Sequence, residues 1–207
     1  MKRQSKAAPI SIVYSLSNVA NSYNAVGRFD DAHKLVDEAF GILNSEKIYM
    51  LDGFALMYNT RGKIYAKEGK WKEAVDAFGR TVDLTRQVER RSYIYMKRLV
   101  NLAEVLEKSK KFKTCLEYTK EALDIKEVTI KTLPHNTIVI ECLQCMAKVY
   151  DYYGYSKEMK DTLYALEQEC KRLEDMCSDQ YNSSKTAVIE KTMQEVKEKM
   201  ATLVVRS

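Results

Sequence analysis

Residues 58–78 read YNTRGKIYAKEGKWKEAVDAF, and this stretch decides the fold. Apolar residues recur three and four positions apart between Tyr58 and Tyr65, which places them in one stripe along a helix. Gly62, inside that stripe, leaves room for a second helix to approach closely. Gly69 can adopt the left-handed conformation that ends a helix and starts a tight turn. The stretch therefore predicts a helix, a short turn and a second, antiparallel helix.

The same helix–turn–helix pattern occurs four times along the chain. One such pair cannot bury its apolar face alone, so neighbouring pairs are expected to stack. The copies align on a small residue in the first helix and on a residue in the turn; these are Ala20, Gly62, Ala103 and Ala147, and Gly27, Gly69, Lys110 and Gly154.

This arrangement resembles the tetratricopeptide repeat, whose pattern is W-x2-L-G-x2-Y…A-x3-F. The match is strongest in the first two copies, which also have Ala32 and Ala74 in their second helices. In the third copy Lys110 replaces the turn glycine, and in the fourth Ser156 and Met159 fill the usual aromatic and small positions. The resemblance implies an all-α, right-handed α-solenoid of antiparallel helix pairs; a helical bundle with coincidental spacing is the alternative. The predicted array occupies residues 10–177, with repeats at about 11–45, 54–88, 95–128 and 139–176.

The repeats are longer than usual. Equivalent turn residues lie 42, 41 and 44 positions apart, whereas the common tetratricopeptide repeat has about 34 residues. The extra residues can lengthen both helices of a pair by roughly one turn. Long repeats, the L-x-N-L-A-like segments 16–20 and 99–103, and the loop Leu133-Pro134-His135-Asn136 resemble kinesin light chains, which have a P-x-H-P loop. The second proline of that loop and the long heptad region of the light chains are missing, so the resemblance concerns the repeat subtype.

The composition describes a folded, helical protein. Of 207 residues, 45% are hydrophobic and 30% are charged, with only two prolines and seven glycines. No apolar run approaches the roughly 20 residues that cross a bilayer, and no apolar signal-peptide core follows the basic residues 1–6. We therefore predict a cytoplasmic protein without membrane insertion, and cytoskeletal or ciliary association stays open.

Basic and acidic residues are interspersed, 34 against 29, which gives a net charge of +5. The densest basic stretch, Arg86–Arg98, is interrupted by Glu89 and by aromatic residues. We interpret it as a solvated helix face, with contact to RNA or to an acidic partner as the alternative. No nucleic acid is expected among the partners.

Five cysteines are present, and an odd number in a reducing compartment indicates free thiols. Cys142-x-x-Cys145 has a spacing found in zinc sites, but Cys170 and Cys177 have the wrong spacing for a second half and no histidine lies near them. The first pair also lies within a helical apolar pattern. Helix packing is therefore the prediction for this pair, and metal or redox chemistry is the alternative.

The sequence contains no catalytic motif. His33 and His135 are the only histidines, and neither accompanies a serine or cysteine nucleophile motif. The chain has no Walker loop, no G-x-G-x-x-G and no H-E-x-x-H. We predict that the protein is not an enzyme and has no cofactor or metal.

The two ends are predicted to differ from the array. Residues 1–9 are interpreted as a flexible basic tail that ends at Pro9. Residues 184–206 are predicted to form an amphipathic helix whose apolar residues step by 4, 3, 4 and 3, a narrow seam of coiled-coil type. Two roles stay open, a cap over the end of the fourth repeat or a dimerisation or partner helix. The seam consists of Ile189, Met193, Val196, Met200 and Leu203.

The first helices of a right-handed stack line its concave side, and their faces opposite the core stripe are rich in Asn, Gln and Lys. Amide side chains both donate to and accept from a peptide main chain, and lysines favour acidic ligand residues. The predicted peptide-binding groove consists of Asn18, Asn21, Asn59, Lys63, Lys97, Asn101, Glu104, Gln144 and Lys148.

Tetratricopeptide co-chaperones hold a C-terminal carboxylate with a clamp of lysines, asparagines and an arginine. Only Asn21 and Lys97 match that clamp here, so chaperone-tail binding is not predicted. The sequence predicts a scaffold or adaptor that binds an extended peptide or partner segment in the groove. The alternative is a structural subunit of a larger cytoskeletal or ciliary complex, packing through its convex face or its last helix.

Overall fold

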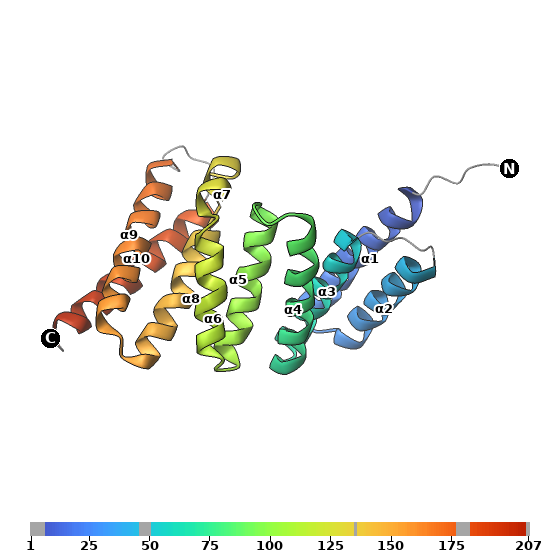
Figure 1. The fold of residues 1–207 in the computed structure, drawn as a ribbon, viewed down its shortest axis with the longest axis horizontal. Helices are drawn as coiled ribbons and strands as arrows, with labels where there is room; N and C mark the ends of the chain where they lie inside the picture. Colours follow the sequence, from blue (N-terminus) through green and yellow to red (C-terminus); the bar gives the residue numbers. More distant parts are fainter. Residues whose placement is uncertain (1–6, 46–50, 135, 177–182, 206–207) are drawn as a thin grey trace. The chain divides into compact units, whose positions relative to one another are not determined.

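The computed structural model describes residues 7–45, 51–134, 136–176 and 183–205, and these ranges form helices and no strand (Figure 1). The predicted all-α fold class is confirmed. Of the residues discussed above, residues 1–6 of the predicted tail, His135, Cys177 and residue 206 of the predicted last helix lie outside the described ranges. The chain divides into two compact units, residues 1–90 and 91–207. Unit 1 contains α1 (Ala7–Ala25), α2 (Phe29–Ser45), α3 (Leu51–Lys67) and α4 (Trp71–Val88). Unit 2 contains α5 (Tyr93–Lys108), α6 (Phe112–Leu123), α7 (Lys126–Thr132), α8 (Ile138–Tyr153), α9 (Ser156–Met176) and α10 (Ser183–Val205).

Left-handed turn residues join the two helices of each predicted pair. Gly27, Gly69 and Gly154 have φ angles of +79°, +77° and +69°, which confirms the predicted turns. Lys110 takes the same place in the third pair with φ of +58°, a backbone conformation that residues other than glycine rarely adopt. Its turn closes in the same way, because the N–H of Lys111 donates to the carbonyl oxygen of Leu106 at 2.8 Å. The turn geometry is therefore preserved where the glycine is lost.

Two segments differ from the predicted pattern. Helix α1 begins at Ala7, so residues 7–9 are helical rather than part of a tail. Pro9 is tolerated there because N–H groups in the first helical turn have no intrahelical partner. In the third repeat the extra length does not extend the second helix: α6 ends after 12 residues and the seven-residue α7 follows. The chain bends at this point and buries Ile125.

Unit 1 is held together by apolar contacts between its two helix pairs. One buried cluster joins Val13, Ala39, Leu43 and Met57, and another joins Ala20, Ala32, Val36 and Ile64. Ala20 and Ala32 are fully buried, so the first pair closes on small side chains as the sequence predicted. Both clusters take residues from α1, α2 and α3, which ties the first pair to the second.

Polar contacts also connect the first helix pair of unit 1 to the second. The His33 Nε2 atom on α2 lies 3.0 Å from Glu68 Oε2, which follows α3, and Lys70 Nζ lies 2.8 Å from Glu68 Oε1. Burial alone would raise the pKa of Glu68, but the hydrogen bonds from Lys70 and His33 outweigh burial and the pKa is lowered. The ionised carboxylate therefore stabilises unit 1.

Replacing Glu68 with glutamine should lower the stability of unit 1 by roughly 1 kcal/mol at pH 7. Because the folded-state pKa of Glu68 lies below its unfolded value, its contribution is present above the unfolded pKa and is lost as the pH falls through the folded one. Urea unfolding of both proteins at pH 7 and near pH 3 should show the difference shrinking in acid. A difference that stays constant with pH would contradict this account.

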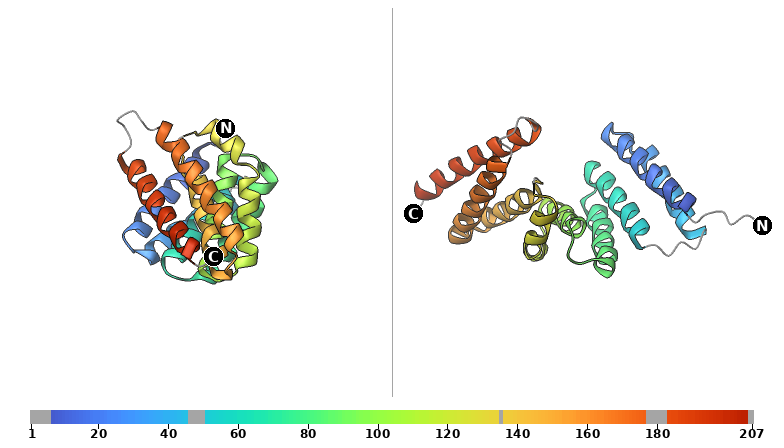
Figure 2. Two further views of the ribbon diagram at one scale, coloured as in Figure 1. Left: turned by 90° about the vertical axis from the view of Figure 1, so that its left-hand side faces the viewer. Right: turned by 90° about the horizontal axis from the view of Figure 1, so that it is seen from above.

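Unit 2 ends in α10, which lies beside α9 (Figure 2). Along the predicted seam, Ile189, Val196 and Leu203 are buried, and Met193 and Met200 are partly buried. The seam packs within the chain, against α9. In the ranges that the structure describes, no helix is both long and apolar enough to span a membrane.

Candidate peptide-binding face

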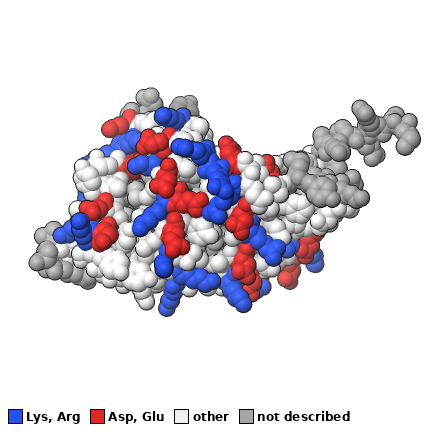
Figure 3. All heavy atoms as spheres, in the orientation of Figure 1, with Lys and Arg blue, Asp and Glu red and all other residues white. Residues whose placement is uncertain are grey.

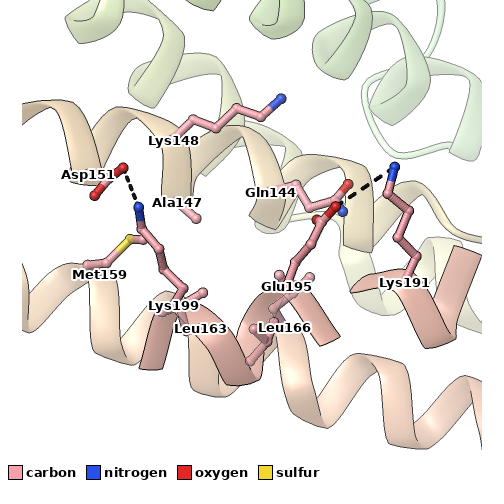
Figure 4. Close-up of a pocket in the computed structure, with 11 residues that line it drawn as sticks. Gln144, Ala147, Lys148, Asp151, Met159, Leu163, Leu166, Lys191, Glu195 and Lys199 are labelled. Atoms are coloured by element: carbon pink, nitrogen blue, oxygen red, sulfur yellow. Dashed lines mark hydrogen bonds and ion pairs between the residues drawn. The ribbon is translucent and has the colours of Figure 1, made fainter. Parts of the chain in front are cut away.

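A cleft of about 400 Å³ lies in unit 2 between α8, α9 and α10 (Figure 4). It exists because α10 packs on α9 and reaches α8 through polar side chains, which leaves the space between α8 and α10 unfilled. The cleft has an apolar floor and a charged or polar rim. The floor consists of Ala147, Met159, Leu163, Leu166 and Val196, and the rim of Gln144, Lys148, Asp151, Lys191, Glu195 and Lys199.

Most of the rim is already paired. Gln144 Nε2 donates to Thr192 Oγ1 at 3.2 Å, and Lys199 Nζ donates to Asp151 Oδ2 at 2.6 Å. Lys148 differs, because it is exposed and makes no hydrogen bond or ion pair with the described residues. Figure 4 shows its ammonium group apart from the rim carboxylates. Lys148 is therefore a cation available to a ligand at the edge of an apolar cleft.

A second group of charges lies on α5 and α8 of the same unit. Lys97 Nζ is 2.6 Å from Glu141 Oε2, so the predicted groove lysine is partly neutralised within the chain. Loss of surrounding water, followed by the nearby Glu141 carboxylate, raises the pKa of Glu104. The opposing effects of Lys97 and Lys148 are smaller. Glu104 and Glu141 are therefore accompanied by the two lysines Lys97 and Lys148, so acidic and basic groups are mixed on this part of the face.

The predicted residues of unit 1 lie in two environments. On α1, Asn18 is exposed, and Asn21 donates to the carbonyl oxygen of Ser17 at 2.9 Å. On α3, Lys63 is exposed, whereas Asn59 is only 7% exposed. Asn101 on α5 of unit 2 is similarly buried, at 9%. The amide side chains of Asn59 and Asn101 therefore pack between helices and offer little surface to a ligand.

Helix α1 approaches α3 closely at Thr60, the residue that follows Asn59. Ser17 and Thr60 face each other there, with their hydroxyl oxygens 2.8 Å apart and both residues buried. Helix periodicity alone places these positions on the outer face, but the neighbouring first helix covers part of that face. Sequence reasoning also missed Lys191 and Lys199, because nothing in the repeat pattern places α10 at the edge of the cleft.

The Cys142-x-x-Cys145 pair points into the contact between α6 and α8. Cys142 Sγ lies 3.3 Å from the carbonyl oxygen of Thr119, and Cys145 Sγ lies 3.4 Å from Cys115 Sγ. Burial raises the pKa of Cys142, and the hydrogen bond with Cys115 followed by burial raises that of Cys145. Within the described ranges no cluster of His, Cys, Asp and Glu has the arrangement of a metal site. These thiols pack α8 against α6, which agrees with the helix-packing role that the sequence predicted.

Comparison with known proteins supports the fold. A family model described as tetratricopeptide repeat matches residues 13–43. No curated protein sequence matches the chain. The crystal structure of BtubC (BKLC) from P. vanneervenii is similar with a TM-score of 0.68 at 15% identity, covering 96% of this chain and 84% of that one. Kinesin light chain TPR-like repeats from Podosopora anserina give 0.66 at 13% identity, covering 93% and 97%. YrrB, described as a TPR protein with an unusual peptide-binding site, gives 0.54 at 17% identity, covering 92% and 89%. These likenesses are of fold, and they confirm the resemblance found in the sequence.

Proposed function

We propose that this chain is a scaffold or adaptor, because it has the tetratricopeptide-repeat fold of kinesin-light-chain-like arrays. Its ligand is an extended peptide or partner segment held on the face formed by the first helices. The observation that carries the proposal is the cleft of unit 2, where the unpaired Lys148 stands beside an apolar floor. Ligand sites commonly combine an apolar surface with a few polar groups that fix orientation.

The cleft suits a peptide that carries one apolar side chain close to an acidic one. Leu163, Leu166 and Val196 offer apolar surface to the first. Lys148 offers its charge to the second, while Lys199 is already engaged by Asp151. Gln144 can exchange its bond to Thr192 for one to the peptide main chain, since an amide donates and accepts.

Replacing Lys148 with glutamate should weaken binding of such a peptide about tenfold, which corresponds to about 1.4 kcal/mol. The full chain would be screened against a peptide display library, and the enriched peptides then measured by fluorescence anisotropy. Enriched sequences should contain an acidic residue near an apolar one, because the Lys148 ammonium attracts a carboxylate.

The matched control is Lys197→Glu, because Lys197 is exposed on α10 and does not line the cleft. It changes the net charge equally and should leave the affinity within twofold. If both variants lost the same affinity, the loss would come from the change in net charge and not from Lys148. If the screen enriched no peptide, that result would contradict a peptide-binding cleft.

The fold family also fits an interaction role better than an enzymatic one, and free buried thiols suit a reducing compartment such as the cytoplasm. The protein would associate with the cytoskeleton or with cilia if its partner belongs to one of these structures. A structural subunit of a larger complex, packing through its convex face or its C-terminal helix, is the second candidate, and the half-buried aromatic side chains Phe54, Tyr58 and Tyr65 of α3 favour it.

A further inference from the structure

An aromatic stripe runs along α3 on the side of unit 1 that carries α2 and α4. It consists of the aromatic residues Phe54, Tyr58 and Tyr65, with Arg61 between the last two; these four positions step by 4, 3 and 4 residues and are all half-buried. Side chains at these steps lie on one face of a helix and form the kind of seam against which a second helix packs. The packing within unit 1 does not fully cover this seam.

Helix α2 borders one side of the stripe. The Phe40 ring lies 4.9 Å from the ring of Tyr58 and 6.0 Å from that of Phe54. Further along, the His33 ring lies 4.8 Å from the ring of Tyr65. These contacts hold the aromatic rings of α3 in place, so the stripe is a preformed surface.

Helix α4 borders the other side and leaves open space. Two cavities of about 340 Å³ and 370 Å³ lie between α3 and α4, and both are lined by Tyr58 and Arg80. Together they extend from Phe54 and Leu84 to Tyr65 and Glu73. We call this surface the α3 groove. From Phe54 to Tyr65 it spans about 16 Å, or three helical turns, at about 1.5 Å per residue.

One of the two arginines in the α3 groove is neutralised within the chain. Arg61 forms an ion pair with Asp37 and lies over the Phe40 ring, 4.7 Å from its centroid. Arg80 donates to the Tyr58 hydroxyl at 3.1 Å and lies over the same ring. Arg61 is therefore neutralised by Asp37, whereas the exposed Arg80 contacts the uncharged Tyr58 side chain and makes no ion pair with the described residues.

Two carboxylates in the groove are not used. Glu73 and Asp76 are exposed on one side of α4, and neither makes a hydrogen bond or ion pair with the described residues. Figure 3 views this side of unit 1 and shows carboxylates interleaved with basic side chains along α4. Among the described residues, these two carboxylates stand against one guanidinium without an ion pair, that of Arg80, so the groove has an excess of negative charge that a partner's basic residues complement.

We propose that the α3 groove binds an amphipathic α-helix of a partner protein, about three turns long. Its apolar side packs on Phe54, Tyr58 and Tyr65, and its lysines or arginines reach Glu73 and Asp76. The 4-3-4 spacing gives α3 a ridge of large side chains, and such a ridge packs into the groove of a second helix, which favours a helical occupant over an extended one. This surface lies in unit 1, and the inference does not depend on the cleft of unit 2.

The test uses the full chain and three synthetic 18-residue peptides labelled with fluorescein. All carry leucines at steps of 4, 3 and 4; one has lysines beside them, one has glutamates, and one has the lysines with a central proline. The lysine peptide should bind at least tenfold more tightly than the glutamate or proline peptide. The double variant Glu73→Lys/Asp76→Lys should lose at least tenfold of that affinity and bind the glutamate peptide more tightly than the unaltered chain does.

The matched control is Asp124→Lys/Glu127→Lys in unit 2, which reverses two exposed carboxylates at the same spacing. It should leave the affinity within twofold, and circular dichroism should confirm that both double variants fold. Three results would each overturn the proposal: no preference for the lysine peptide, equal binding of the proline peptide, or equal losses in both double variants. Self-association of the unaltered chain that Glu73→Lys/Asp76→Lys abolishes would also overturn it, by assigning the groove to a second copy.

Discussion

Replacing Ile189 and Val196 together with alanine should destabilise unit 2 by about 5 kcal/mol, since emptying one such buried site costs about 2–5 kcal/mol. Both residues belong to the seam of α10 and are only 1% and 3% exposed. They cover α9, whose Leu163 and Leu166 would otherwise face water. Urea unfolding followed by far-UV circular dichroism would measure the loss, because unit 2 contains no tryptophan.

The matched control is Glu190→Ala/Lys197→Ala, which changes two exposed residues of the same helix. It should alter stability by no more than about 0.5 kcal/mol. Sedimentation of the unaltered chain separates the two roles that the sequence left open for α10. A monomer would support the capping role, whereas a dimer that the double alanine variant dissociates would contradict it.

Replacing Gly62 with leucine should destabilise unit 1 by about 3 kcal/mol, because overfilling a packed contact typically costs about 1–3 kcal/mol and leucine adds four carbons. A Cβ atom at residue 62 would lie 2.9 Å from Cδ1 and Cε1 of Phe78. Phe78 is itself only 3% exposed, so its ring has little room to move away. The only tryptophan of the chain, Trp71, begins α4 and reports on unit 1 by its fluorescence.

Gly79→Ala serves as the control for this prediction. Gly79 is also helical, but a Cβ atom there would meet nothing within 4 Å. Alanine is favoured over glycine in a helix by about 0.5–1 kcal/mol, so this variant should be slightly more stable than the unaltered chain. Destabilisation by both substitutions to a similar extent would show that the close approach at Gly62 is not what the repeat requires.

The local structure of this protein could be predicted closely from its sequence. Helix pairs follow from apolar spacing, and the turns at Gly27, Gly69 and Gly154 follow from the need for a positive φ. Even Lys110 was placed correctly in its turn, because its position in the repeat is fixed by residues on both sides. These features depend on short-range geometry, which the order of residues determines directly.

The candidate site could be predicted only in part. The pattern placed Gln144 and Lys148 on the outer side of a first helix, and the structure puts both on the rim of the cleft. It did not reveal that Asn59 and Asn101 are largely buried. A residue's exposure depends on the neighbouring helix as well as its own, and periodicity within one helix carries no information about that neighbour.

The sequence by itself determined that this chain is a series of long antiparallel helix pairs, because apolar periodicity and turn chemistry are properties of consecutive residues. Only the tertiary structure decided which polar residues remain available to a partner. Ser17 and Thr60 bond to each other and Lys97 pairs with Glu141, whereas Lys148, Glu73 and Asp76 form no ion pair with any residue in the described part of the chain. That division arises between helices that are distant in sequence, where the distance between two side chains is set by packing.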